Sequence, residues 1–137
     1  MKKIGTLNSH LSCIIASMGH KDKLVLCDSG LPIPRDAELV DLAVRKNLPG
    51  FLDTLEVILE ELQVEGAIVA QEMATVSNGL MTSVQELLPD IDFEEVPHER
   101  FKQLTRDATQ NGNIAFVRTG EATPYANIVL ISGVTFP

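Results

Sequence analysis

The chain has 137 residues, of which 45% are hydrophobic, and its 11 basic and 19 acidic side chains give a net charge of −8. This length suits one domain with a buried core, and the negative charge argues against nucleic acid or an anionic membrane as a partner. No apolar run reaches the roughly 20 residues that span a bilayer, and the basic start of the chain lacks the apolar stretch of a secretory signal. We therefore expect a soluble cytoplasmic protein.

Helical and extended patterns alternate from the start of the chain. Residues 8–18 carry apolar side chains at i, i+3, i+4 and i+7, which predicts an amphipathic helix, and Gly19 is expected to end it in a left-handed conformation. Leu24–Cys27 is a short apolar run between charged residues and predicts a core strand. Residues 38–45 fit either period, and we favour a strand.

The alternation continues to the end of the chain. Pro49–Leu62 is the clearest predicted helix because its leucines form an apolar stripe. Strands are predicted at 66–71, 92–96, 113–118 and 127–131, and helices at 78–88 and from Pro97 onward. This order predicts a single α/β domain, residues 1–137, with helices packed on a central, mostly parallel sheet.

Two polar residues lie on either side of the first predicted strand. His20 precedes the strand and Asp28 follows it. An imidazole with a pKa near neutrality is a natural proton shuttle, and a nearby carboxylate can orient it or hold a hydroxyl. The alternative is that both are plain turn and cap residues.

Two further pairs of polar residues are candidates for binding. His98 and Lys102 are four residues apart at the start of the helix from Pro97, so both project from one polar face; the alternative is an ordinary solvated helix start. Tyr125 is the only tyrosine, and Asn127 follows on the same side of the last strand. A ring together with an amide suits a sugar, although a strand-edge tyrosine in water is the plainer interpretation.

The common nucleophile and metal motifs are missing from this sequence. It contains no Gly-rich phosphate loop, no Ser nucleophile elbow and no HExxH zinc motif. Cys13 and Cys27 both lie among apolar neighbours, and we expect both to be reduced core residues. Asp28 would raise the pKa of the adjacent Cys27 thiol, so we do not expect that cysteine to act as a nucleophile.

Five short segments, each weak alone, combine into a specific pattern. They are Asn8–His10, Gly19–Asp22, Cys27–Pro34, Val96–His98 with Lys102, and Tyr125–Asn127. Together they resemble the D-ribose pyranase family, which is related to the fucose mutarotases. The similarity runs over essentially the whole chain.

This resemblance implies an isomerase that interconverts the β-pyranose and β-furanose forms of D-ribose, with no cofactor and no metal. It implies a homo-oligomer, a decamer of stacked pentamers, with sites near subunit boundaries. It makes His20 the proton-donating catalytic residue. The sugar-binding positions that it implies are Asp28, His98, Lys102, Tyr125 and Asn127.

Two alternatives stay open. The first is a non-catalytic ribose-binding accessory protein of a sugar-uptake system, which would use the same binding residues. The second is a metal-dependent isomerase in which His20, Asp28 and His98 hold zinc, although their spacing matches no common zinc motif.

Overall fold

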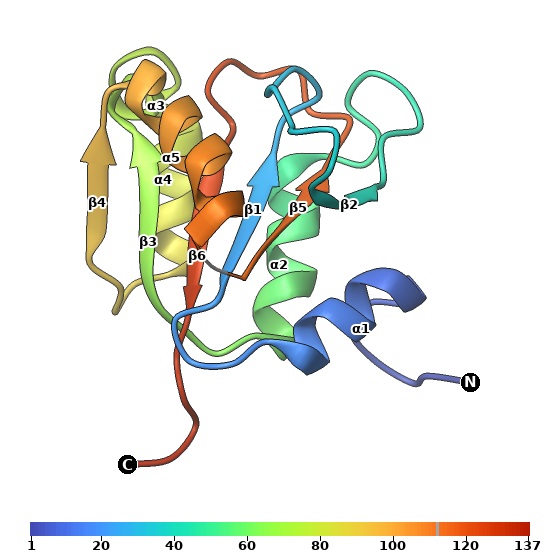
Figure 1. Cartoon of the computed structure of the whole chain (residues 1–137). Coiled ribbons are helices and arrows are strands. Elements are labelled where there is room, and N and C mark those ends of the chain that lie inside the picture. The colour runs from blue at the N-terminus through green and yellow to red at the C-terminus, as the bar shows by residue number, and fades with distance from the viewer. Residues whose placement is uncertain (112) are drawn as a thin grey trace.

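A central sheet with helices on both faces forms the structure (Figure 1). The computed structural model describes residues 1–111 and 113–137, with all of their side chains except those of 108–111. The helices are α1 (Ser9–Ser17), α2 (Phe51–Glu61), α3 (Gln71–Val76), α4 (Asn78–Leu87) and α5 (His98–Asn111). The strands are β1 (Lys23–Cys27), β2 (Glu38–Asp41), β3 (Val64–Ala70), β4 (Phe93–Val96), β5 (Ile114–Arg118) and β6 (Ile128–Ser132).

The sheet is mixed, with strand order β2-β5-β1-β6-β3-β4. The pairs β2 with β5, β5 with β1, and β3 with β4 are parallel, whereas β6 is antiparallel to both of its neighbours, β1 and β3. In Figure 1 the arrowheads of β1, β3 and β4 accordingly point up and that of β6 points down. We call the edge at which the parallel strands end the carboxyl edge and the opposite one the amino edge.

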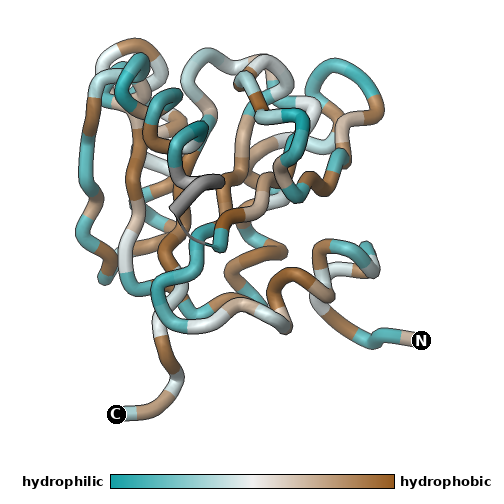
Figure 2. The backbone as a smooth tube through the Cα atoms, viewed as in Figure 1, coloured by the Kyte–Doolittle hydropathy of each residue, from teal (hydrophilic) through white to brown (hydrophobic). Residues whose placement is uncertain are grey.

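Alternate residues of the strands build one core on each face of the sheet. On one face, Leu24 and Leu26 of β1 pack with apolar side chains of α1, α2, α3 and α4. On the other face, Val25 and Cys27 pack with Phe101 of α5. In Figure 2 the hydrophobic colour follows the central strands, whereas much of α5 and of the outer loops is hydrophilic. The result is a three-layer α/β arrangement, which confirms the predicted packing of helices on a central, mostly parallel sheet.

Most predicted elements are confirmed, and three predictions need correction. α3 was missed, because six residues are too few to show a helical period. Gly19 is not left-handed: α1 ends at Ser17, and Lys21 takes the positive φ of 72° instead, where its N–H bonds the Ser132 carbonyl at 2.9 Å. Cys13 lies exposed on the outer face of α1, so only Cys27 is a core cysteine.

Among the described residues, no helix combines the length and the apolar character needed to cross a membrane.

Gly120 offers a direct test of close packing between two loops beyond the carboxyl edge. A Cβ at this position would lie 2.5 Å from the Leu48 carbonyl oxygen and 2.7 Å from the Leu48 nitrogen, which are backbone atoms and cannot rotate away. We expect Gly120→Ala to lower the free energy of unfolding by about 1–3 kcal/mol, measured by chemical denaturation. The matched control is Gly79→Ala in α4, where a Cβ meets no atom within 4 Å; it should be neutral or stabilising. Equal effects of the two substitutions would contradict the packing.

Candidate functional site

Four of the predicted site residues come together at the carboxyl edge. Asp28 directly follows β1, and His98 begins α5 just after β4. Because β6 runs against its neighbours, its first residues also reach this edge, so Tyr125 and Asn127 join them. Ligands of open α/β sheets bind beyond the carboxyl ends of the strands. We call Asp28, His98, Tyr125 and Asn127 the carboxyl-edge cluster.

Asp28 and Asn127 hold each other in a reciprocal pair of hydrogen bonds. The Asp28 N–H donates to Asn127 Oδ1 at 3.0 Å, and Asn127 Nδ2 donates to Asp28 Oδ2 at 3.1 Å. The N–H groups of Gly30 and Leu31 both donate to Asp28 Oδ1 at 2.9 Å. Asn127 is fully buried. A carboxylate offers about four acceptor positions, so the Oδ2 atom keeps one for a hydroxyl.

His98 and Tyr125 form the aromatic part of the cluster. Their rings meet edge to face, with 4.9 Å between centroids. Tyr125 has a positive φ of 63°, and its carbonyl accepts the Asn127 N–H at 2.9 Å. The Nδ1 atom of His98 is buried without a hydrogen-bond partner among the described residues. A buried polar atom left unpaired is costly, so this nitrogen lacks the partner that a bound polar group would supply.

Glu72 fixes the start of α5 from a neighbouring element. Both carboxylate oxygens of Glu72, the second residue of α3, accept the backbone N–H of His98, at 2.9 and 3.2 Å. A carboxylate at a helix N-terminus satisfies a free N–H and complements the helix dipole. Lys102 lies one turn further along α5, where its ammonium donates to Glu99 at 2.9 Å. The structure therefore leaves Lys102 on the same helix as His98 but paired to an exposed neighbour.

Glu121 ties the loop that carries Tyr125 to two other segments. Its Oε1 accepts the N–H of Phe51 at the start of α2 at 2.9 Å, and its Oε2 accepts the Thr123 hydroxyl at 2.9 Å. Its carbonyl accepts both the N–H and the hydroxyl of Ser29, each at 3.0 Å. Burial alone would raise the pKa of the Glu121 carboxyl, but the hydrogen bonds from Phe51 and Thr123 lower it below its ordinary value. Glu121 therefore acts as an ionised anchor for the cluster.

His20 lies at the amino edge, at the opposite end of the strands from the carboxyl-edge cluster. It precedes β1, whereas Asp28 follows it; five strand residues at about 3.3 Å each put roughly 15 Å between the two. His20 Nε2 lies 2.8 Å from Oε2 of Glu65, and Lys21 pairs with the other oxygen of that carboxylate. Asp28 therefore cannot orient the imidazole of its own chain.

This separation also bears on the zinc alternative. His20, Asp28 and His98 of one chain cannot ligate one ion across the sheet. Over residues 1–111 and 113–137, no three His, Cys, Asp or Glu side chains are grouped so as to hold a metal. Burial, and then the charge of Asp28, raises the pKa of the Cys27 thiol to about 12, as expected for a core residue.

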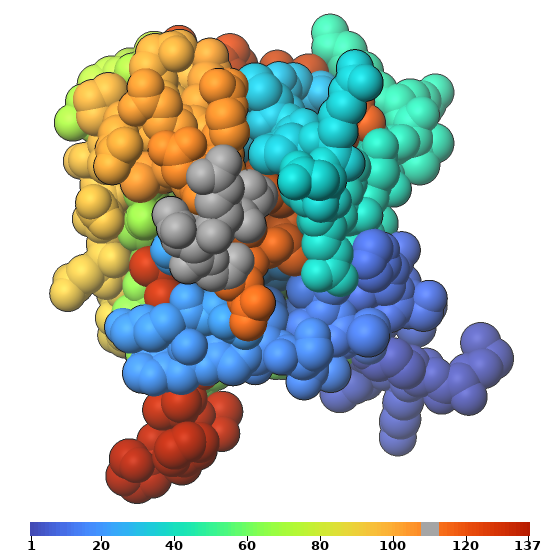
Figure 3. Space-filling model, in the orientation of Figure 1, coloured from blue at the N-terminus to red at the C-terminus, as the bar shows by residue number. Residues whose placement is uncertain are grey.

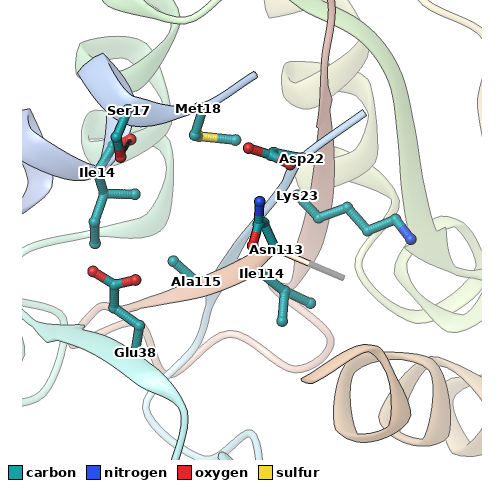
Figure 4. Close-up of a pocket in the computed structure, with 9 residues that line it drawn as sticks. All are labelled: Ile14, Ser17, Met18, Asp22, Lys23, Glu38, Asn113, Ile114 and Ala115. Atoms are coloured by element: carbon teal, nitrogen blue, oxygen red, sulfur yellow. Dashed lines mark hydrogen bonds between the residues drawn. The ribbon is translucent and has the colours of Figure 1, made fainter. Parts of the chain in front are cut away.

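The amino edge also carries hollows. The cavity in Figure 4, of about 290 Å³, lies between α1 and the starts of β1, β2 and β5, and its polar lining includes Asp22 and Glu38. It contains none of the six predicted site residues. A second hollow, of about 400 Å³, is lined by His20 together with Phe136 near the C-terminus. Figure 3 shows the C-terminal residues protruding from the body at this edge.

Sequence reasoning missed three carboxylates that hold the predicted residues in place. They are Glu65, Glu72 and Glu121. Each contacts a residue at least 26 positions away along the chain, and no local pattern marks such a partner. The one usable signal was the position of Glu72, which directly follows a predicted strand, as Asp28 does.

Comparisons with known proteins point to one family over the whole chain. The model of the RbsD / FucU transport protein family matches residues 1–135. A protein of Clostridium perfringens (strain SM101 / Type A) named D-ribose pyranase is 48% identical over 136 residues, which cover 99% of this chain and 100% of the relative. One of the same name from Coprothermobacter proteolyticus is 50% identical, with the same coverage.

Solved structures agree. RbsD of Bacillus subtilis, determined in complex with D-ribose, superimposes with a TM-score of 0.89 at 42% identity, covering 99% of this chain and 100% of that one. The fucose mutarotase of Streptococcus pneumoniae, determined with L-fucose, has a TM-score of 0.75 at 21% identity over 99% of this chain and 100% of that one, and it supports the fold alone.

The role of Glu121 predicts a specific pH dependence. A carboxyl whose pKa is lower in the folded state than in the unfolded state stabilises the fold at pH values above its unfolded-state pKa. This stabilisation is lost as the pH falls through the folded-state pKa. We expect Glu121→Gln to lower the free energy of unfolding at neutral pH, because the amide nitrogen cannot accept from Thr123. The difference in free energy of unfolding between the variant and wild type should shrink at pH values below 4.5, the ordinary pKa of the carboxyl. Chemical denaturation at neutral pH and at a pH below 4.5 measures this difference. Glu56→Gln, on the exposed face of α2, is the control and should cost little at either pH. A wild-type advantage that stays constant into acid would contradict the role of the carboxylate.

Proposed function

Because the chain belongs to the RbsD / FucU transport protein family, we propose that it acts as a D-ribose pyranase. The observation that carries the proposal is the identity of 43–50% over 136 residues with proteins of that name. The carboxyl-edge cluster supports it, since it combines an open carboxylate position, an unpaired imidazole nitrogen and an aromatic ring. Donors, acceptors and a ring face are what a sugar requires of a site.

The reaction asks only for proton transfers. The proton of the anomeric hydroxyl is removed as the carbonyl at C1 forms, and the ring oxygen is protonated as its bond to C1 breaks. A different hydroxyl then attacks C1 to close the furanose, and its proton passes to the carbonyl oxygen. The proton count is unchanged over the cycle, so one acid-base group serves both halves. Such a group contributes about 10²- to 10⁴-fold to a rate.

We assign the proton transfers to His20 and the sugar contacts to the cluster. Asp28 would accept a hydroxyl at its open Oδ2 position, and His98 would contact the sugar through its unpaired Nδ1. The Tyr125 ring would lie beside the sugar. Asn127 would act mainly by holding Asp28, because its amide is fully buried and bonded. Lys102 would join only by leaving Glu99.

A complete site would then need two chains. His20 lies at the amino edge and the cluster at the carboxyl edge, so we propose that His20 of one subunit reaches the cluster of the next. Exposed apolar side chains support contacts at both edges. They are Val134 and Phe136 beside the hollow at the amino edge, and Val44, Leu48 and Val76 in segments that follow the carboxyl ends of strands. A decamer of stacked pentamers in the cytoplasm is the assembly that we expect.

The non-catalytic alternative would use the same cluster without proton transfer. A ribose carrier needs no histidine at the opposite edge, whereas His20 is held there by a carboxylate 2.8 Å away. Binding data alone do not separate the two functions, and only exchange between the ring forms does.

Exchange between the ring forms of ribose tests the proposal directly. We expect added wild-type protein to broaden the pyranose and furanose NMR signals of D-ribose, or to increase the transfer of magnetisation between them. His20→Ala should lower this exchange by about 10²- to 10⁴-fold while still binding the sugar. His10→Ala, in α1, is the matched control and should exchange like wild type. Exchange equal to buffer for both wild type and His20→Ala would leave only the carrier function.

Mixing two inactive variants tests the shared site. His20→Ala and Asp28→Asn alter opposite edges, so each should be nearly inactive alone. In mixed oligomers the intact halves meet at about one in four interfaces, and we expect exchange to return to roughly that share after unfolding and refolding the variants together. Sedimentation gives the subunit number of each mixture. If co-refolded oligomers of the right size stay inactive, each site lies within one chain and the shared arrangement is wrong.

A further inference from the structure

Glu65 has no assigned part in the reaction, yet its carboxylate is bonded on both sides beside His20. One oxygen lies 2.8 Å from His20 Nε2, and the other pairs with Lys21. The hydrogen bonds, first from Lys21 and then from His20, lower the pKa of this carboxyl below its ordinary value. Glu65 is therefore ionised at neutral pH and can only accept hydrogen bonds.

The backbone around Glu65 is built to aim its side chain. β3 pairs with β6 through Val64 and Ser132, and then through Gly66 and Ile131, so Glu65 is the extra residue of a β-bulge. Bulges of this kind re-aim a side chain at the end of a ladder. The bulge lies beside the turn of His20, where the Lys21 N–H bonds the Ser132 carbonyl at 2.9 Å.

Gly133 leaves the room that this arrangement needs. A Cβ at position 133 would lie 3.0 Å from the Glu65 Cβ and 3.4 Å from the Glu65 nitrogen. The Gly133 N–H also donates to the Gln63 carbonyl at 2.9 Å, which holds the two segments together. A larger residue at this position would push Glu65 away from the His20 turn.

We infer that Glu65 is the positioning residue of His20, holding the ring as its Nε2–H tautomer and leaving Nδ1 as the atom that exchanges protons with the sugar. The assignment of proton exchange with the sugar to Nδ1 rests on the proposed function. An ionised carboxylate accepts only, so the imidazole nitrogen facing it carries the hydrogen. Nδ1 of the neutral ring then has a free lone pair.

The proton path follows from that tautomer. Nδ1 takes the proton of the anomeric hydroxyl as C1=O forms, and Nδ1–H returns it to the ring oxygen as that oxygen leaves C1. For closure, Nδ1 takes the proton of the attacking hydroxyl and gives it to the carbonyl oxygen. While Nδ1 holds the proton, the ring is an imidazolium, and the Glu65 carboxylate 2.8 Å away stabilises its charge.

Nitrogen NMR of the labelled protein reads the tautomer without any activity measurement. At a pH where the rings are neutral, we expect His20 of the wild type to be Nε2–H with a slowly exchanging, hydrogen-bonded proton. His10 is the internal control, because its side chain is as exposed as that of His20, at 49% against 50%, but its Nε2 lies 3.5 Å from the Glu38 carboxylate, whereas His20 Nε2 lies 2.8 Å from that of Glu65. His10 should show the tautomer mixture and the fast exchange of free imidazole.

Two variants at position 65 grade the effect. Glu65→Ala removes both acceptor and charge, so the His20 proton should exchange like that of His10, and ribose exchange should fall at least about tenfold, as when a carboxylate that orients a catalytic imidazole is lost. Glu65→Gln keeps an acceptor oxygen, so its rate of ribose exchange should lie between those of Glu65→Ala and wild type. Glu38→Gln, which makes the same change beside the other histidine, should alter neither readout. Ribose affinity should stay within about twofold in all of them, since Glu65 does not touch the sugar in this account.

A wild-type His20 in the Nδ1–H form, or a His20 signature unchanged by Glu65→Ala, would overturn the positioning role, as would Glu65→Ala with full exchange activity. A protected Nε2–H that depends on Glu65 in a protein without ribose exchange would support the positioning and refute the proposed function.

Discussion

The direction of β6 is the constraint on which the candidate site depends. β6 runs antiparallel between β1 and β3, so its first residue and not its last meets the carboxyl edge. Asn127, just before β6, thereby comes to lie against Asp28, just after β1, and the two exchange hydrogen bonds of 3.0 and 3.1 Å. A parallel β6 would carry Asn127 and Tyr125 to the amino edge. The sugar contacts proposed here therefore follow from one strand reversal in an otherwise parallel sheet.

The same topology divides the proposed machinery into two halves. β1 separates His20 from Asp28 by its full length, and each half has its own carboxylate support: Glu65 for the histidine and Glu72 for the start of α5. In the proposed arrangement, neither half alone carries out proton transfer on a bound sugar. In this account the enzyme is completed by assembly, and subunit contacts are part of the catalytic geometry. Electrostatic support is already in place at each edge before the halves meet, which is the preorganisation that proton transfer benefits from.

The fold was largely predictable from the sequence, because its strands are short apolar runs and its longer helices have clear stripes. The predictions that failed did so for different reasons. Gly19 is the residue type that commonly ends a helix, but the hydrogen bond from the Lys21 N–H to the Ser132 carbonyl places the positive φ at Lys21. Cys13 has apolar neighbours, yet the helical period turns it outward. The proposed site residues came from a family resemblance, whereas the pairing of Glu65 with a histidine 45 positions earlier has no local signature.

The most direct measurement is a crystal structure of the assembled protein with D-ribose bound. We expect the sugar to lie between two chains, with a hydroxyl on Asp28 Oδ2 of one subunit and its anomeric and ring oxygens within hydrogen-bond distance, about 3 Å, of His20 Nδ1 of the neighbour. Glu65 should remain on Nε2 of that same ring. Ribose bound wholly within one chain, with every His20 imidazole remote from its ring oxygen, would contradict the account.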